Sequence, residues 1–347
     1  SQTACAEMAL RVLGVGPGDE VIVPAYTYTA SASVICHVGA TPVMVDCASD
    51  SLEMDYEVMA RAITERTKAV IPVDLGGVPC DYDIVFAVLE AKRDLFHPAS
   101  DIQEALGRVA VCEDAAHALG STYHGQMIGS IADFTSFSFH AVKNFTTAEG
   151  GCLAWNWPSE ISDEEVYRKV QLLSLHGQSK DALAKTKLGA WEYDVLGPWY
   201  KCNMTDIQAA LGLVQLKRYQ GMLDRRKELI ALYDSYLGPL GVESLPHYGD
   251  DCASSGHLYI CRVPNITPEQ RNEIIEAMAE RGVATNVHYK PLPMMTAYKD
   301  LGFDIADYPR AYARFANEIT LPLHTCLSDE EAHYVASSFA EIVEGVR

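Results

Sequence analysis

Short apolar runs that alternate with helical stretches constrain the fold of this chain more than any other feature. Most of the runs are hydrophobic without a break, which is typical of strands buried on both faces of a mainly parallel sheet. The stretches between them, such as 56–64 and 82–92, have the pattern of crossover helices. From Glu20 to Trp157 the runs are 21–23, 42–45, 69–73, 109–111, 134–139 and 152–155. The first part of the chain therefore predicts an α/β domain.

The second part of the chain has a different pattern and predicts a smaller α+β domain. The stretch 206–236 has apolar residues three and four positions apart, and we interpret it as long helices that form the spine between two domains. Beyond it we expect, in order, a strand at 257–263, a helix at 268–281, a strand near 285–289 and a helix at 329–346. We place the large domain at 1–220 and the small domain at 221–347. The segment 93–107 resembles a surface insertion rather than core.

Length, charge and cysteine usage narrow the class of protein. A chain of 347 residues is long enough for about two domains, each with its own core. The formal net charge of −20 argues against nucleic acid or an anionic membrane surface as a partner, because phosphate groups would be repelled. The ten cysteines are scattered, without a CxxC pair or zinc-type spacing, so we expect reduced cysteines in a cytoplasmic protein and no bound metal. No apolar run approaches the length of a membrane span.

Lys143 and Asp114 point most directly to a chemistry. Lys143 follows the run 134–139, and so apolar a setting would lower the pKa of its amine and favour the free base that attacks an aldehyde. Asp114 follows the run 109–111, at the edge where open α/β sheets bind ligands. A buried carboxylate there needs a cationic partner, which a protonated pyridine nitrogen would supply. The pair is what a pyridoxal phosphate enzyme needs, because the amine forms a Schiff base with the cofactor and the carboxylate keeps the ring protonated.

Plainer roles stay open for both residues. An exposed loop position is the default for a single lysine, and an aspartate before two alanines commonly caps a helix. Ser138 and His140 raise the odds of a functional role, because each follows a phenylalanine and both therefore point the same way along the strand. Their polar side chains converge near Lys143.

The start of the chain could hold the cofactor phosphate. Thr3 and Ala4 open an apolar helix that runs to Leu13, and the free N–H groups and dipole of a helix start favour an anion. Taken alone, a plain N-cap is the commoner role for such a threonine. Tyr28 could stack on a flat cofactor ring or simply lie at the rim of the site. The glycines at 14–18 form a turn and not a dinucleotide loop, because they precede a strand.

Eight short motifs follow one another from the first half of the chain to its last helix. They are GDEVIVP (18–24), VGATPV (38–43), EDAAH (113–117), SFHAVKN (138–144), EGG (149–151), YKCNMTDIQAA (200–210), VHYKP (287–291) and LPL (321–323). In this order they resemble the motifs of the DegT/DnrJ/StrS family of sugar-nucleotide aminotransferases.

The resemblance implies a pyridoxal phosphate-dependent transferase of fold type I, with a mainly parallel seven-stranded sheet between helices and a smaller α+β domain at the C-terminus. It implies that Lys143 is the Schiff-base lysine and that Asp114 pairs with the pyridine nitrogen. His117 would lie beside the ring near its 3-hydroxyl group, and Tyr28 would stack on its face. The other implied contacts are Thr3, Ala4 and Ser138 at the phosphate, Asn203 at the phosphate of the neighbouring subunit's cofactor, and His140 and His288 in the sugar-nucleotide pocket.

The activity that the resemblance implies is transfer of the amino group of L-glutamate to a keto-sugar nucleotide, in a homodimer with shared active sites. Lysine at position 143 argues against the family's dehydratase branch, which carries histidine there. Two alternatives stay open, an aminotransferase for a non-sugar ring ketone and a regulatory protein that binds the cofactor without turnover. Three features depart from the family pattern, and the apparent insertion at 93–107 is one of them. Asp74 stands where the family usually has histidine, and the family has further residues before the phosphate motif, so we expect the N-terminal part of the large domain to be missing.

Overall fold

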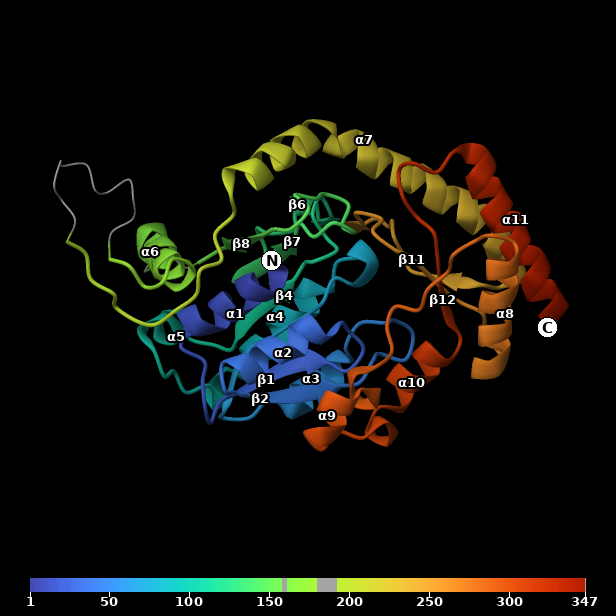
Figure 1. Ribbon diagram of the computed structural model, residues 1–347. Helices are drawn as coiled ribbons and strands as arrows, with labels where there is room; N and C mark the ends of the chain where they lie inside the picture. Colours follow the sequence, from blue (N-terminus) through green and yellow to red (C-terminus); the bar gives the residue numbers. More distant parts are fainter. Residues whose placement is uncertain (158–160, 180–191, 347) are drawn as a thin grey trace.

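A six-stranded sheet forms the centre of the large part of the molecule (Figure 1). The structure is a computed structural model that describes residues 1–157, 161–179 and 192–346. All neighbouring strands are parallel except the last pair, β7 and β8. In spatial order the strands are β2 (Thr41–Val45), β1 (Glu20–Pro24), β3 (Thr67–Val70), β4 (Ala110–Asp114), β7 (Phe134–Ser138) and β8 (Gly151–Trp155). The prediction of an α/β domain with a mainly parallel sheet is confirmed.

The expected number of seven strands is wrong for the described residues. Each of the six apolar runs supplies one strand, and the number seven came from the family resemblance and not from a seventh run. β8 lies at one edge of the sheet, and none of its residues is fully buried. The interior strands β1, β3 and β4 are buried at every position, as expected for strands covered on both faces.

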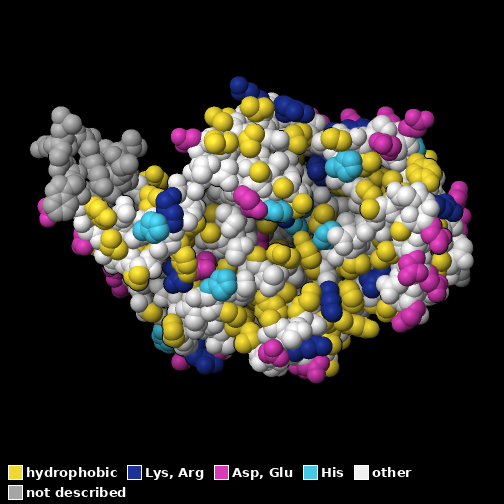
Figure 2. Space-filling view, in the orientation of Figure 1, with side chains coloured by type: hydrophobic (Ala, Val, Ile, Leu, Met, Phe, Trp, Pro, Cys, Tyr) yellow, Lys and Arg dark blue, Asp and Glu magenta, His cyan; other side chains and the backbone are white. Residues whose placement is uncertain are grey.

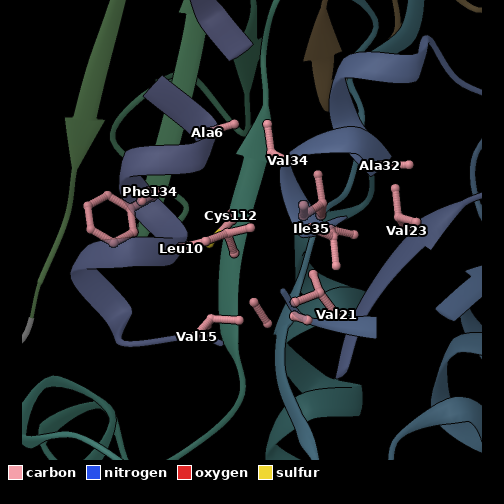
Figure 3. Close-up of a cluster of buried hydrophobic side chains, with 14 of the residues drawn as sticks. Ala6, Leu10, Val15, Val21, Val23, Ala32, Val34, Ile35, Cys112 and Phe134 are labelled. Atoms are coloured by element: carbon pink, nitrogen blue, oxygen red, sulfur yellow. The ribbon is translucent and has the colours of Figure 1, made fainter. Parts of the chain in front are cut away.

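Helices cover both faces of the sheet. Successive side chains of a strand point to opposite faces and therefore pack into different hydrophobic clusters. On β1, Val21 and Val23 belong to one buried cluster, whereas Ile22 belongs to another. Figure 3 shows the first cluster, where two helices pack against β1 and β4. The first cluster includes residues of α1 (Gln2–Leu13), α2 (Thr29–His37) and α6 (Asp163–Ser174), and the second includes residues of α3 (Tyr56–Ala62) and α4 (Tyr82–Ala91).

The segment 93–107 is exposed in part but anchors buried side chains in the core, so the expectation of a surface insertion is wrong. It contains α5 (Asp101–Leu106), and Ile102 lies buried in the first cluster. The side-chain amide of Gln103 donates a hydrogen bond of 2.9 Å to the carbonyl oxygen of Leu13 at the end of α1. α5 therefore closes the C-terminus of α1. The sequence shows little sign of this role, because the apolar residues Ile102 and Leu106 stand among polar and charged neighbours.

One continuous helix, α7 (Asp206–Leu237), arches over the top of the view in Figure 1 and joins the two parts of the molecule. It begins at Thr205, whose hydroxyl group accepts a hydrogen bond from the N–H of Gln208, while the Gln208 side chain accepts one from Thr205 in return. The helical prediction for 206–236 is confirmed, but the stretch forms one continuous helix instead of several.

The C-terminal part is an antiparallel sheet covered by helices. The last turns of α7 share a buried cluster with two further helices and two of the strands. The elements are β9 (Glu243–Ser244), β11 (Tyr259–Arg262), β12 (Glu318–Leu321), α8 (Pro268–Glu280) and α11 (Asp329–Val346). The strand expected near 285–289 is wrong, because Asn286 makes only one bridge to Thr320. The ladder stops there because the N–H of His288 donates to the Glu318 carboxylate instead of to a strand carbonyl.

Two short helices return to the large part. α9 (Thr296–Asp300) and α10 (Pro309–Ala316) place Tyr298 and Ala311 in the first cluster. A second small sheet also joins the two parts, with β10 (Cys252–Ala253) beside β5 (Thr122–Tyr123) and β6 (Gln126–Met127). Because α7 runs unbroken through position 220, the domain boundary there stays a prediction. In the described part of the chain we find no helix that is both long and apolar enough to cross a membrane.

Candidate active site

A pocket of about 390 Å³ opens around Lys143 at the carboxyl ends of β4 and β7. Its wall is formed by the start of α1, the start of α2, the loop after β7 and the segment around His288. Histidine side chains gather near the middle of this face in Figure 2. Six of the predicted site residues line the pocket, and they are Thr3, Tyr28, Ser138, His140, Lys143 and His288. Asp114 and His117 line an adjoining pocket that also contains Lys143.

Lys143 is held in a turn just beyond β7. Its N–H donates a hydrogen bond of 2.9 Å to the His140 carbonyl oxygen. The next residue, Asn144, is buried, and its side chain donates to the Ser255 carbonyl oxygen at 2.9 Å and lies 2.8 Å from Nδ1 of His257. Burial lowers the pKa of Lys143 to about 8, against the opposing attraction of Asp114. The amine can therefore lose its proton near neutral pH, which a nucleophile for an aldehyde must do.

Asp114 is the last residue of β4 and is 4% exposed. Ser31 Oγ donates to its Oδ2 at 2.7 Å, and the Ala116 N–H donates to its Oδ1 at 3.1 Å. Among the described residues it has no salt-bridge partner. Burial raises the pKa of the Asp114 carboxyl group, since these hydrogen bonds and the Lys143 charge compensate only in part. A buried carboxyl group without a cation fits the protonated ring nitrogen of pyridoxal phosphate.

His117 is buried beside this carboxylate. The N–H of Gly76 donates to its Nδ1 at 3.2 Å, and because a backbone amide can only donate, the ring proton is on Nε2. The hydroxyl group of Tyr289 lies 3.3 Å from Nε2, and the ring of His257 lies 4.3 Å from the His117 ring. Burial lowers the pKa of His117 well below its ordinary value. The imidazole is therefore a neutral hydrogen-bond donor toward the pocket.

α1 begins two residues earlier than its sequence suggested. Ser1 is the N-cap, and its Oγ accepts a hydrogen bond of 3.3 Å from the Ala4 N–H. The alternative of Thr3 as N-cap is therefore wrong, and Thr3 and Ala4 lie inside the first turn. Thr3 lines the pocket together with Ser138 from the end of β7. A helix start beside a serine hydroxyl group suits a phosphate.

The other predicted residues differ in how close they come to Lys143. Tyr28 is 58% exposed at the start of α2, with its ring centroid 5.6 Å from that of Tyr289. His140 Nε2 lies 3.4 Å from a carboxylate oxygen of Glu149 at the pocket mouth. Asn203 is exposed just before α7 and does not line the pocket of its own chain. Its side-chain amide donates a hydrogen bond to the carbonyl oxygen of Met204.

Several residues that shape the site were not predicted from the sequence. Ser31 holds Asp114 from 83 positions away, and Tyr289 closes the pocket against His117. Gln2 is 4% exposed and donates to Ser136 Oγ at 3.0 Å. Serine in a helix and glutamine at a helix start carry no sequence signal for such roles. The VHYKP motif was the only signal that could have drawn attention to Tyr289.

Asp74, where the resemblance leads one to expect histidine, is fully buried below the pocket. The hydroxyl group of Tyr82 donates to Asp74 Oδ1 at 2.7 Å and lies 2.6 Å from Glu113 Oε1. Burial and the mutual repulsion of the two carboxyl groups raise the pKa of Asp74 well above its ordinary value. At least one of the two carboxyl groups therefore keeps its proton at neutral pH.

Comparison with known proteins places this geometry in a family. Residues 1–340 match the model of the DegT/DnrJ/EryC1/StrS aminotransferase family. The chain is 40% identical to "Spore coat polysaccharide biosynthesis protein SpsC" of Bacillus subtilis (strain 168), over 99% of this chain and 84% of SpsC. It is 37% identical to "Uncharacterized protein MJ1066" of Methanocaldococcus jannaschii, over 99% of this chain and 84% of MJ1066.

Solved structures similar to this chain lead to the same family. "Putative sugar aminotransferase Spr1654 from Streptococcus pneumoniae" in its PLP form has 58% sequence identity and a TM-score of 0.96, covering 100% of this chain and 86% of that chain. PseC of Helicobacter pylori, described as an "aminotransferase involved in the biosynthesis of pseudoaminic acid", has 28% identity and a TM-score of 0.84, covering 99% and 85%. The fold is that of the type I pyridoxal phosphate-dependent transferases. The chain therefore belongs to the DegT/DnrJ/EryC1/StrS family and is an aminotransferase that uses pyridoxal phosphate.

Proposed function

We propose that this enzyme transfers the amino group of L-glutamate to a keto-sugar nucleotide. The observation that carries the proposal is the presence, at one pocket, of Lys143, with its lowered pKa, and of the buried Asp114, which has no salt-bridge partner among the described residues. The names of SpsC, a spore-coat polysaccharide biosynthesis protein, and of Spr1654, a sugar aminotransferase, support a sugar as the amino acceptor. The product would then serve the synthesis of a glycan or a related metabolite.

The site residues would divide the work as follows. Pyridoxal phosphate supplies an aldehyde for the amine and a ring that accepts electrons. Lys143 would bind that aldehyde and, once displaced by the amino donor, would carry the proton between two carbon atoms. Asp114 would pair with the ring nitrogen, and His117 would donate to an oxygen beside the ring from Nε2. Tyr28 would cover one face of the ring.

The phosphate and substrate contacts follow the walls of the pocket. Thr3, in the first turn of α1, would bind the phosphate with its N–H group, and Ser138 would add its hydroxyl group. The N–H group of Ala4 would join them by exchanging its hydrogen bond to Ser1 Oγ for one to the phosphate. His140 and His288, on opposite segments of the wall, would bind the sugar nucleotide.

We propose further that the enzyme is a homodimer with shared sites. The N-terminal half of α7 exposes a run of large apolar side chains next to Asn203, and hydrophobic side chains are visible over this part of α7 in Figure 2. Surfaces of this kind mark interfaces in soluble proteins. The exposed residues are Ile207, Leu211, Leu213, Val214 and Leu216, of which Ile207 is 78% exposed. A second copy on this surface would bring Asn203 to the neighbouring cofactor phosphate. A cytoplasmic location is in keeping with ten free cysteines.

The test is an absorption spectrum of the purified protein with pyridoxal phosphate, before and after addition of L-glutamate. We expect the band of lysine-bound cofactor, its conversion by glutamate to the pyridoxamine band, and its recovery with one keto-sugar nucleotide from a panel. Lys143→Ala should lack the first band, and Lys299→Ala, on the exposed face of α9, should behave like the wild type.

The outcomes separate the alternatives. Recovery with a non-sugar ring ketone and with no sugar nucleotide would identify the other kind of aminotransferase. A bound cofactor that no amino donor converts would favour a regulatory protein.

A further inference from the structure

Three side chains behind the pocket form a continuous chain of hydrogen bonds that ends at His288. A carboxyl oxygen of Glu318 lies 2.6 Å from Thr320 Oγ1, which in turn lies 2.9 Å from His288 Nδ1. Glu318 is 0% exposed and Thr320 is 4% exposed, both on β12. His288 lines the pocket that contains Lys143. One end of the chain is therefore sealed from water, while the other faces the substrate.

The direction of these hydrogen bonds depends on where the mobile proton is, because a hydroxyl group donates only one hydrogen atom. When Glu318 is ionised, Thr320 donates to it, His288 donates from Nδ1 to Thr320, and Nε2 is a bare acceptor. When Glu318 is protonated, each bond reverses, and His288 carries its proton on Nε2. Both arrangements leave the imidazole neutral.

We propose that Glu318, Thr320 and His288 form a proton relay, in which His288 Nε2 exchanges a proton with the carbonyl oxygen of the oxo substrate. His288 would be a second catalytic residue beside Lys143, with Thr320 and Glu318 as positioning residues that act through it. The relay deepens the proposed function and rests on the pocket being the substrate site, but not on which sugar is bound.

Each transfer balances. The Glu318 O–H proton moves to Thr320 Oγ1, the Thr320 hydroxyl proton moves to His288 Nδ1, and the His288 Nε2 proton moves to the substrate oxygen. Three bonds to hydrogen break and three form, so Glu318 ends with the negative charge and the substrate oxygen gains one proton. The reverse sequence takes a proton from an attacking water molecule.

Amino transfer needs such a group. An oxo substrate that becomes an amine loses its oxygen as water, and that oxygen must be protonated before it leaves. Lys143 already serves the proton that moves between carbon atoms. A separate donor on the opposite wall lets the two transfers proceed at different atoms.

The surroundings suit both ends of the relay. Burial raises the pKa of Glu318 to about 8, so it holds a proton at neutral pH, although the charge of Arg271 lowers the pKa. Burial, with the Lys143 charge, lowers the pKa of His288 to about 4, so the ring passes on a second proton rather than keeping it. Other groups that face the relay are Tyr26, whose hydroxyl group donates to the His288 carbonyl oxygen, Asn286, 3.4 Å from His288 Nε2, and the buried Cys261. On the pocket side, the ring centroid of Tyr289 lies 5.0 Å from that of His288, and the buried His117 and His257 interact electrostatically with His288.

The direct test follows the His288 tautomer by nitrogen NMR in the cofactor-loaded protein labelled with ¹⁵N-histidine, from pH 6 to pH 10. His288→Gln identifies the signals. In the wild type we expect the proton on Nε2 at low pH and on Nδ1 at high pH, with the change following the ionisation of Glu318. Thr320→Val, which has the same shape without the hydroxyl group, should abolish the change, and Thr320→Ser should keep it. A single tautomer across the whole range in the wild type would overturn the proposal.

Kinetics supply the second test. With saturating L-glutamate, we expect Thr320→Val to slow conversion of the bound cofactor at least tenfold, with the KM for glutamate changed less than threefold, and Thr320→Ser to stay within threefold of the wild type. Equal rates in all three proteins would show that the relay does not take part in catalysis. If the wild type does not react with glutamate, the proposed donor is wrong, while the NMR result still decides whether the relay exists.

Discussion

Gly151 lies directly against the backbone of Ser1. A Cβ atom on Gly151 would come within 2.6 Å of the Ser1 carbonyl carbon and 2.9 Å of the Gln2 backbone nitrogen. No side chain fits there, so the first residue of β8 is in contact with the N-terminus of α1. The glycine of the EGG motif thus lets the start of α1 pack directly against the start of β8.

We expect Gly151→Ala to weaken binding of pyridoxal phosphate by tenfold or more, because α1 must move away from the sheet to make room. The measurement is a titration of the cofactor-free protein with pyridoxal phosphate, followed by absorbance. Gly221→Ala is the matched control, since no atom lies within 4 Å of a Cβ at this position on α7. Equal affinity in both variants would show that the close contact is unimportant.

Removing the Ser31 hydroxyl group should impair the cofactor site from a distance. Ser31→Ala deletes the 2.7 Å hydrogen bond to Asp114 and leaves one carboxylate oxygen without that donor. A hydrogen bond to a charged group contributes roughly 1.5–3 kcal/mol, so cofactor affinity should fall by about one to two orders of magnitude. Ser33→Ala on the same helix should have no effect, because Ser33 contacts only the Ala30 carbonyl oxygen.

Lys143 should be a source of instability in the cofactor-free enzyme. Its folded pKa of about 8 lies below the ordinary lysine value, so between these two values the unfolded chain binds more protons, and its contribution to stability rises with pH. We expect Lys143→Met to raise the free energy of unfolding by about 3 kcal/mol at pH 7 and by much less at pH 10. Urea unfolding at both pH values measures this. A gain that does not change with pH would contradict it.

The buried pair of Asp74 and Glu113 should make the enzyme less stable as the pH rises. Burial raises the pKa of both carboxyl groups, so above the unfolded value of about 4 the folded state binds more protons, and stability is lost on the way to the raised pKa values. Asp74→Asn removes one titrating group. We expect the free energy of unfolding of the variant, relative to the wild type, to improve from pH 5 to pH 8.5. If the free energies of unfolding of the two proteins change in parallel over this pH range, the prediction is wrong.

A charge on the exposed face of α7 should separate the proposed dimer. Leu213 is 65% exposed in the single chain, and Leu213→Asp would place an unpaired charge in the interface. We expect sedimentation of a monomer and at least a tenfold loss of cofactor affinity, since Asn203 would no longer reach a neighbouring site. Ile84→Asp, an exposed position on α4, is the control and should remain a dimer.

The sequence predicts the sheet because burial on both faces demands uninterrupted apolar residues, and Val21, Val70 and Val111 show this pattern. It also predicts that Asp114 and Lys143 lie at one pocket, since Asp114 ends one such strand and Lys143 follows another. The stretch near 285–289 was misjudged because strand pairing there depends on the side chain of Glu318, which takes the N–H of His288. No local pattern records a contact of that kind.

Contacts between distant residues explain what the sequence could not predict at the site. Ser31 reaches Asp114 across 83 positions, and Tyr289 reaches His117 across 172. Serine and tyrosine are ordinary residues in a helix and a loop, so only the folded geometry gives them a role. The single helix α7 was easier to predict, because capping at Thr205 and its helical periodicity are local properties.

The continuity of α7 has a mechanical consequence. A helix of 32 residues is a stiff rod about 48 Å long, and here its last turns are embedded in the C-terminal cluster while its first turn follows Asn203. A small rotation of that cluster at one end becomes a displacement of Asn203 at the other. In the proposed dimer, helix α7 of one subunit would reach the cofactor site of its neighbour. Substrate binding that rotates the C-terminal cluster of one subunit would then shift Asn203 relative to the cofactor phosphate of the other.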